Sequence, residues 1–313
     1  ISVFAKYEYG NSEITDSKSE TTEIQTSNSI VNFELDGSLK EIYEIEGNNI
    51  EILGMTATKN SGTVFITKEE NGFFITILDS VNNLIRKMIL PIEYESDNVE
   101  INDIALHPDG TFIITGGFEG TLSKELNIKC SDFGAKFIMK LNIDAKIIWN
   151  KLIEFQYDSG SGYYNLKSKL AITSLGDIYL TGETQGNALF SNKISITAPY
   201  NYTTNKFKAE NKVFLAKYSS EGIIQWVKSV DNLSYIQSIT SSNENVIITY
   251  TINDIKFNTK VFGSKIDTSK NNNSIISIFN KNGNLVTNIS SDVSEFSDVA
   301  IINDTIHIIG TYS

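Results

Sequence analysis

A short strand-turn-strand unit recurs along the chain, and this repeat limits the possible folds more than any other feature. Its clearest copy spans residues 213–228 (VFLAKYSSEGIIQWVK), where apolar residues alternate with the two-residue period of a strand on both sides of a turn. Residues 136–151 (KFIMKLNIDAKIIWNK) repeat the pattern, and Trp149 stands where the first copy has Trp226. Both segments are therefore predicted to be hairpins of one repeat.

A second type of hairpin alternates with the first. In residues 99–117 a His-Pro-Asp-Gly turn separates two apolar strands, and three later segments align with this one, namely residues 169–184, 237–250 and 298–312. Insertions such as residues 185–211 fall after the second strand of this hairpin. One unit thus contains four strands in roughly 40 residues before insertions, which is the size of one propeller blade.

The composition favours an all-β fold, because Ile, Val, Thr, Tyr and Phe dominate the apolar runs and the chain has only three Pro. A four-stranded sheet cannot bury both of its faces alone, so the units must stack face to face around an axis. We predict a single domain, residues 1–313, folded as a β-propeller of about six four-stranded blades, within a range of about five to seven. Residues 3–7 and 298–312 are expected to complete one blade together and so close the ring.

Charge and cysteine content exclude several classes of partner. The net charge is −12 and the isoelectric point is near 4.7, which disfavours nucleic acid, whose binding needs basic surfaces. The single cysteine, Cys130, excludes an intramolecular disulfide and a cysteine-rich zinc site. No apolar run approaches the roughly 20 residues of a membrane-spanning helix. We expect neither nucleic acid nor a membrane span.

The repeat unit resembles the bacterial β-propeller repeat known as the SBBP repeat, over most of residues 30–313. The matching residues are Phe214, Ala216, Lys217, Gly222, Trp226, Gly176, Tyr179, Thr181 and Gly182. The match is poor before residue 30 and in residues 275–289, which lack Trp. This resemblance implies a propeller fold and a module of surface or extracellular proteins, mostly without assigned chemistry. Comparable repeats occur in proteins of large DNA viruses.

Two aspartates are the candidate metal ligands. Asp103 and Asp298 fall at the same place on the predicted innermost strand, where both carboxylates are expected to face the central channel. Two carboxylates near the axis suit a divalent cation with oxygen ligands, the one cofactor that the sequence suggests. The alternative is an ion-paired or solvated channel wall, because Lys169 occupies the matching position of another unit.

The other conspicuous residues predict no catalytic site. Trp149 and Trp226 occupy one fixed place in the repeat, which favours packing between blades over the stacking of a ligand. His107 and His307 share no motif, and the chain has no Gly-x-Ser-x-Gly sequence. The Gly-rich residues 115–120 lack the following Lys-Ser/Thr of a phosphate-binding loop.

The sequence favours a non-catalytic structural or interaction module. Its long loops, residues 185–211 and 260–273, would be presented to protein or glycan partners on a cell surface, extracellularly or in a virion, with assembly into a larger particle. The alternative is a lyase or hydrolase that uses channel carboxylates and a divalent metal. Clustered carboxylates at the channel would favour the enzyme, whereas Ser, Thr and Lys scattered around it would favour the scaffold.

Overall fold

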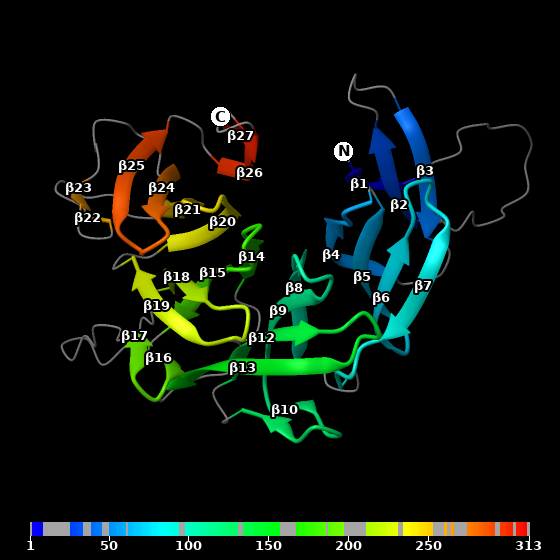
Figure 1. The fold of residues 1–313 in the computed structure, drawn as a ribbon, viewed down its shortest axis with the longest axis horizontal. Helices are drawn as coiled ribbons and strands as arrows, with labels where there is room; N and C mark the ends of the chain where they lie inside the picture. The colour runs from blue at the N-terminus through cyan, green and yellow to red at the C-terminus, as the bar shows by residue number, and fades with distance from the viewer. Residues whose placement is uncertain are drawn as a thin grey trace, which may run out of the picture. The chain divides into compact units, whose positions relative to one another are not determined.

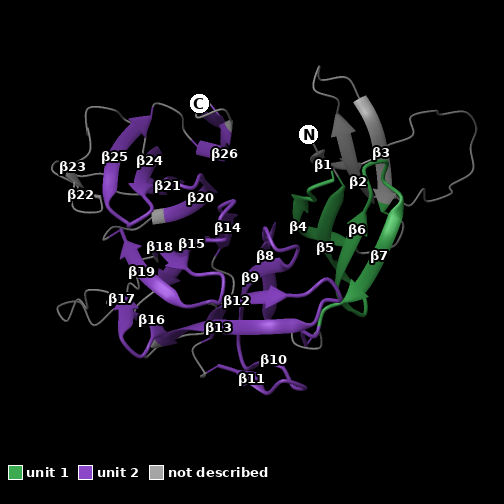
Figure 2. Cartoon of the chain, viewed as in Figure 1, with its two compact units in different colours: residues 1–90 green, residues 91–313 purple. Residues whose placement is uncertain are grey.

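The computed structural model of the chain is all-β in every segment that it describes, which confirms the predicted fold class (Figure 1). These segments contain no helix long and apolar enough to cross a membrane. The chain forms two compact units, residues 1–90 and 91–313 (Figure 2). The described residues are 2–8, 26–33, 39–45, 50–60, 62–93, 98–130, 134–156, 167–185, 187–196, 211–230, 234–252, 260–261, 264–265, 274–291, 295–302 and 305–311.

Unit 1 contains two antiparallel sheets. The first has three strands in the order β1 (Ser2–Glu8), β2 (Thr26–Phe33) and β3 (Leu39–Ile45). The second has four strands in chain order, β4 (Glu51–Ala57), β5 (Thr63–Glu69), β6 (Gly72–Leu78) and β7 (Leu84–Ile89). Phe65 and Leu78 are buried in this unit against Met55 and its neighbours.

The described part of unit 2 contains four successive antiparallel sheets, each named here by its first strand, and two short strand pairs that lie in insertions. The β8 sheet contains β8 (Val99–Leu106), β9 (Phe112–Phe118), β12 (Ala135–Leu141) and β13 (Ile147–Gln156). The β14 sheet contains β14 (Ser168–Ile172), β15 (Ile178–Gln185), β18 (Asn211–Tyr218) and β19 (Ile224–Ser229). The β20 sheet contains β20 (Ser234–Ser241), β21 (Asn245–Ile252), β24 (Ser274–Asn280) and β25 (Leu285–Ser291). The β26 pair consists of β26 (Glu295–Ile302) and β27 (Thr305–Thr311).

The sheets repeat one another in register as well as in strand order. The first strand of a sheet carries a β-bulge after Ile101 in β8, and equivalent bulges follow in β4, β20 and β26. The outer strand pair shifts register after Lys140 in β12, and the same shift occurs after Lys217 in β18 and in β6 and β24. Because a bulge changes which side chains face which side of a sheet, shared bulges keep the inward faces equivalent. The repeat predicted from the sequence is thus a structural repeat.

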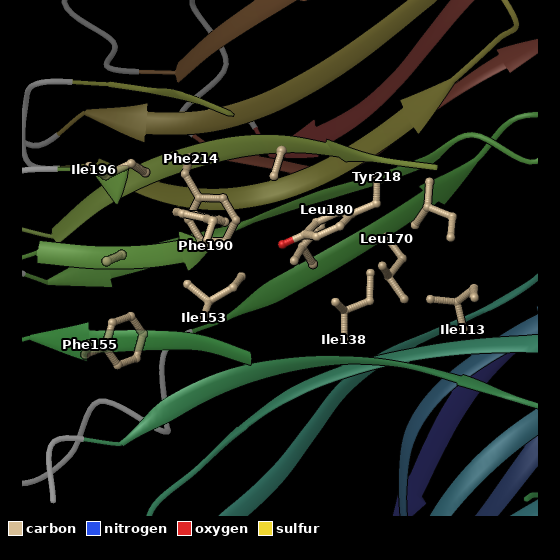
Figure 3. Packing of buried hydrophobic residues seen from close by; sticks show 13 residues of the cluster. Ile113, Ile138, Ile153, Phe155, Leu170, Leu180, Phe190, Ile196, Phe214 and Tyr218 are labelled. Carbon is tan, nitrogen blue, oxygen red and sulfur yellow. The ribbon is translucent and has the colours of Figure 1, made fainter. Parts of the chain in front are cut away.

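Successive sheets of unit 2 bury their facing sides against each other. One cluster fills the space between the β8 and β14 sheets, with Ile113 and Ile138 from one side and Leu180 and Phe214 from the other (Figure 3). A second cluster joins the β14 and β20 sheets, and a third joins the β20 sheet to the β26 pair. Burying one such side chain contributes roughly 1.5–3 kcal/mol, so these interfaces stabilise sheets that could not cover themselves.

The insertion at residues 185–211 corrects a prediction, because part of it is a hairpin and not a surface loop. Strands β16 (Asn187–Ser191) and β17 (Ile194–Ile196) pair with each other, and β16 extends the β8 sheet by pairing with β13. The physical reason is that the long β13 would otherwise leave a free outer edge. Phe190 on β16 is 5% exposed and packs edge-on against Phe214 at 5.0 Å between ring centroids. Residues 197–210 lie outside the described residues.

Two other insertions follow the second strand of their sheets, as the sequence predicts. Between β9 and β12 lie β10 (Thr121–Ser123) and β11 (Ile128–Lys129). Between β21 and β24 lie β22 (Lys260–Val261) and β23 (Ser264–Lys265), whereas residues 266–273 fall outside the described part.

The strands near the two chain ends pair within their own units, β1 with β2 and β26 with β27. The predicted single domain, the number of blades and the closure of the ring by residues 3–7 and 298–312 therefore stay predictions.

The packing of β16 gives a direct test of the extended β8 sheet. Phe190→Ala is expected to lower the free energy of unfolding by about 3–5 kcal/mol, because it opens a cavity in the cluster that contains Phe214. Chemical denaturation measures this loss. The control is Leu175→Ala, since Leu175 is 77% exposed and its truncation should change stability by less than about 0.5 kcal/mol. Equal small effects of both substitutions would contradict the packed hairpin.

Candidate functional site

Four polar residues occupy one equivalent position on the first strands of unit 2. In strand order they are Asp103, Lys169, Ser238 and Asp298. Their positions are equivalent because each residue pairs with the same position on the second strand of its own sheet. We call them the inner-strand row. The sequence alignment that placed Asp103, Lys169 and Asp298 at matching positions is thereby confirmed.

Asp103 connects the first strands of two sheets. One of its carboxylate oxygens accepts the Ile104 N–H at 2.9 Å, and the other accepts the Leu170 N–H of β14 at 2.8 Å. Beside it, the Ser168 hydroxyl of β14 donates to the Asn102 side chain of β8 at 2.8 Å. These contacts join β8 to β14 along their polar sides.

Asp298 makes the corresponding connection between β20 and β26. Its Oδ1 accepts the Ser238 hydroxyl at 2.5 Å and the Val299 N–H at 2.8 Å. Burial raises the pKa of Asp103, Lys169 opposes this rise, and Asp298 adds to it. The two aspartates thus hold equivalent positions on different sheets, and each bonds to a neighbouring first strand.

The inner-strand row mixes carboxylates with Lys169 and Ser238. Among the described residues, no group of three or more His, Cys, Asp and Glu side chains is placed to hold a metal ion. A calcium site normally uses six to eight oxygen ligands, and the Asp103 oxygens already accept backbone N–H groups. A divalent cation at Asp103 and Asp298 stays a prediction, and the contacts present link neighbouring strands.

A cation titration decides that prediction. A calcium ion held by Asp103 and Asp298 would add about 1.4 kcal/mol to the free energy of unfolding at a concentration tenfold above its dissociation constant. The doubly substituted Asp103→Asn, Asp298→Asn chain should lose this gain. Denaturation with and without calcium measures it, and a native chain that calcium does not stabilise would rule the site out.

Trp149 packs against the β14 sheet. Its indole N–H donates to the Ser220 carbonyl in the turn between β18 and β19 at 3.1 Å. The Lys140 ammonium donates to the same carbonyl at 3.3 Å and pairs with Asp109 at 2.8 Å. A Cβ added to Gly222, which has φ +73°, would lie 2.9 Å from the indole ring. We call this arrangement the Trp-turn contact.

The β14 sheet repeats the Trp-turn contact toward the β20 sheet. Trp226 and Lys217 both donate to the Lys281 carbonyl, at 3.3 and 3.4 Å. Lys217 also pairs with Asp177 at 2.7 Å, and a Cβ on Gly283 would lie 2.8 Å from the indole of Trp226. The predicted packing role of both Trp residues is confirmed, since backbone from the next sheet occupies one face of each ring.

The sequence analysis missed a pair of buried ionisable side chains, Lys136 and Glu183. Lys136 on β12 and Glu183 on β15 are 0% and 4% exposed, and Glu183 accepts the Ile236 N–H of β20 at 3.1 Å. Burial lowers the pKa of Lys136 to about 7, while the charges of Glu183 and Glu100 oppose this shift. Burial also raises the pKa of Glu183. The sequence did hold a signal for this burial. The two-residue alternation of the strand places Lys136 on the same inward side as Ile138.

The pKa of Lys136 predicts a pH dependence of stability. Between pH 7 and 10.5 the unfolded chain binds the proton that the folded chain has lost, so stability rises with pH across this window. The cost of burying the charge is fully present below pH 7. From pH 7 to 9 the free energy of unfolding of the native chain should rise by about 2–3 kcal/mol relative to that of the Lys136→Met chain. The slope is about 1.4 kcal/mol for each pH unit. Denaturant unfolding of both chains at each pH checks this, and parallel curves would refute it.

No protein-family model matches this sequence, and no curated protein sequence matches it either. Among solved structures, the chain is similar to a protein of unknown function from Bacteroides caccae, with 11% identity and a TM-score of 0.36 over 86% of this chain and 91% of that one. It is similar to the calcium-binding protein regucalcin from Agrobacterium tumefaciens, with 12% identity and a TM-score of 0.41 over 89% and 74%. The Pan2 WD40 domain of Neurospora crassa gives 12% identity and a TM-score of 0.29 over 78% and 73%.

Proposed function

We propose that the chain is a β-propeller of the SBBP type with about six blades, in which strands near the N-terminus complete the blade begun by β26 and β27. The support is the recurring four-stranded sheet together with the β26 pair, in which the described residues form two strands. Apolar residues near this pair are exposed, with Ile309 of β27 at 69% and Ile289 of β25 at 45%. Two further strands would cover them.

We propose that this propeller is a non-catalytic interaction module whose insertions contact a protein or glycan partner. The observation that carries the proposal is the length of one connection. In the β4 sheet of unit 1 only Glu70 and Asn71 join the second strand to the third. In unit 2 the same connection spans residues 119–134, 186–210 and 253–273. Two residues suffice to connect these strands, so the added length outside the β16–β17 hairpin, which extends the β8 sheet, is available for another purpose.

The insertions supply chemistry suited to recognition. Leu126 lies between β10 and β11 and is 46% exposed, and it follows Lys124 and Glu125 and precedes Asn127. An exposed apolar side chain within a polar rim is the usual composition of a protein-binding patch. The net charge of −12 supports a partner other than nucleic acid. We place the module on a cell surface, extracellularly or in a virion, where assembly into a larger particle would use the same insertions.

Replacing one insertion tests the proposal. In the test variant, Glu-Asn replaces residues 253–273, which reproduces the short turn between β5 and β6. This chain should fold with the native unfolding midpoint but should lose the partner that the native chain binds, identified by cross-linking and mass spectrometry of surface or particle fractions. The control is Leu175→Ser, in the turn at the opposite end of β15, which should bind as the native chain does.

Two results would contradict the proposed function. One is undiminished binding after the same short turn has replaced both residues 253–273 and residues 119–134. The other is turnover of a substrate that disappears in the Asp103→Asn, Asp298→Asn chain, which would favour the metal-dependent lyase or hydrolase.

A further inference from the structure

The β22–β23 hairpin places two lysines directly opposite each other. It lies in the connection between β21 and β24, and its antiparallel register pairs Lys260 of β22 with Lys265 of β23 (Figure 1). Residues directly opposite in such a pair share one side of the sheet, with Cβ atoms about 4.5–5.5 Å apart. Two like charges at these positions destabilise the strand pair. An anion shared by both lysines would therefore stabilise the hairpin.

The connections that carry this hairpin and the β16–β17 hairpin are basic, although the chain is acidic. Residues 253–273 contain four Lys and two Asp, and residues 186–210 contain three Lys and one Glu, so each segment has a net charge of +2. The whole chain carries −12, which leaves −16 for the remaining residues. Lys193, in the turn between β16 and β17, is exposed. Basic segments on an acidic body indicate an anionic partner.

The third insertion of unit 2 does not share this charge. Residues 119–134 contain two Lys and three acidic residues, a net charge of −1. The Lys124 ammonium in this segment pairs with the Glu93 carboxylate at 3.0 Å, and Lys129 of β11 stands opposite Thr121 and not opposite a second lysine. Positive charge is therefore a property of two particular insertions and not of inserted segments in general.

We propose that the β22–β23 hairpin binds an anionic glycan, in which one sulfate or carboxylate group is shared by Lys260 and Lys265. This inference rests on the proposed function, because it names the chemistry of the partner that the insertions contact. Lys193 and the other lysines of residues 186–210 add attraction for further anionic groups along the same glycan chain.

The composition of the two basic connections favours a glycan over other anionic partners. Protein interfaces are enriched in Arg and depleted in Lys, whereas both connections contain Lys and no Arg. Aromatic residues stand beside the lysines in sequence, as in residues 206–208 (KFK), and the negative face of an aromatic ring attracts the C–H groups of a sugar ring. The dense phosphates of a nucleic acid would be repelled by the acidic remainder of the chain.

The first measurement compares the full native chain with two variants of equal net charge, Lys265→Glu and Lys146→Glu. Lys265→Glu turns the like-charge pair into an opposite-charge pair, so the hairpin is retained. Lys146 is exposed in the β12–β13 turn, at the end of the sheets opposite the insertions. Binding to heparin, a sulfated glycan, at low salt should weaken about tenfold or more in Lys265→Glu and less than about twofold in Lys146→Glu.

Three results would overturn the proposal. The first is equal weakening in both variants, or no binding of heparin by the native chain. The second is tighter binding of the native chain to polyglutamate or single-stranded DNA than to heparin, which would assign the hairpin to an acidic protein or a nucleic acid. The third is loss of the native partner when residues 253–273 are replaced but not in Lys265→Glu. In that case the proposed function stands and the anionic glycan does not.

A second measurement locates the bound glycan on the chain. Heparin should slow amide hydrogen exchange in residues 260–265 of the native chain but not in the Lys265→Glu chain. Dextran, a neutral glycan, should slow exchange in neither chain. Protection by heparin that appears only outside residues 260–265 would refute the hairpin as the binding element.

Discussion

A four-stranded sheet has two faces and, within its own repeat, nothing to cover them. In unit 2 the facing sides of successive sheets bury each other, through clusters such as the one that joins Ile138 to Leu180 and Phe214. Because the bulges recur at the same positions, the inward side chains of successive sheets meet in equivalent ways. The Trp-turn contact adds directional hydrogen bonds to this packing, because an indole and an ammonium group of one sheet both donate to one carbonyl of the next sheet.

The two ends of the sheets in unit 2 carry different kinds of residues. The end with the first turns holds contacts between sheets, including His107 with Gly176 and Trp149 with Ser220. The other end carries the insertions that follow the second strands. Apart from the β16–β17 hairpin, which extends the β8 sheet, the connections at the insertion end vary in length and composition between the sheets. This division suits a module that binds through its loops.

The sequence predicts local features of this fold well because they depend on few residues. Turn glycines such as Gly222 and the alternation around them locate the hairpins, and the repeat places Asp103, Lys169 and Asp298 at one position before any coordinates are known. The fixed place of Trp149 is enough to predict packing. Each of these inferences uses neighbouring residues or a comparison between copies.

Contacts between segments that are distant in sequence could not be predicted. The acceptor for Trp149 is a backbone carbonyl, at Ser220, which no residue type announces. The β16–β17 hairpin is short and lies within a polar insertion, so only the free edge of β13 explains it. Lys136 of β12 is buried and its charge interacts with that of Glu183 in the next sheet, and a strand pattern does not show which lysines will be enclosed in this way. The partner of the insertions is likewise a property of another molecule.

The most direct test of the stacked-sheet arrangement is a double-mutant cycle on Trp149 and Gly222, measured by denaturant unfolding. A Cβ at Gly222 would meet the indole at 2.9 Å, so Gly222→Ala should cost about 2–4 kcal/mol in the native chain, from backbone strain and overpacking together. In a Trp149→Leu background only the cost of the backbone conformation should remain, which gives a coupling energy of roughly 1–3 kcal/mol. Additive effects within about 0.5 kcal/mol would contradict the contact and the stacking derived from it.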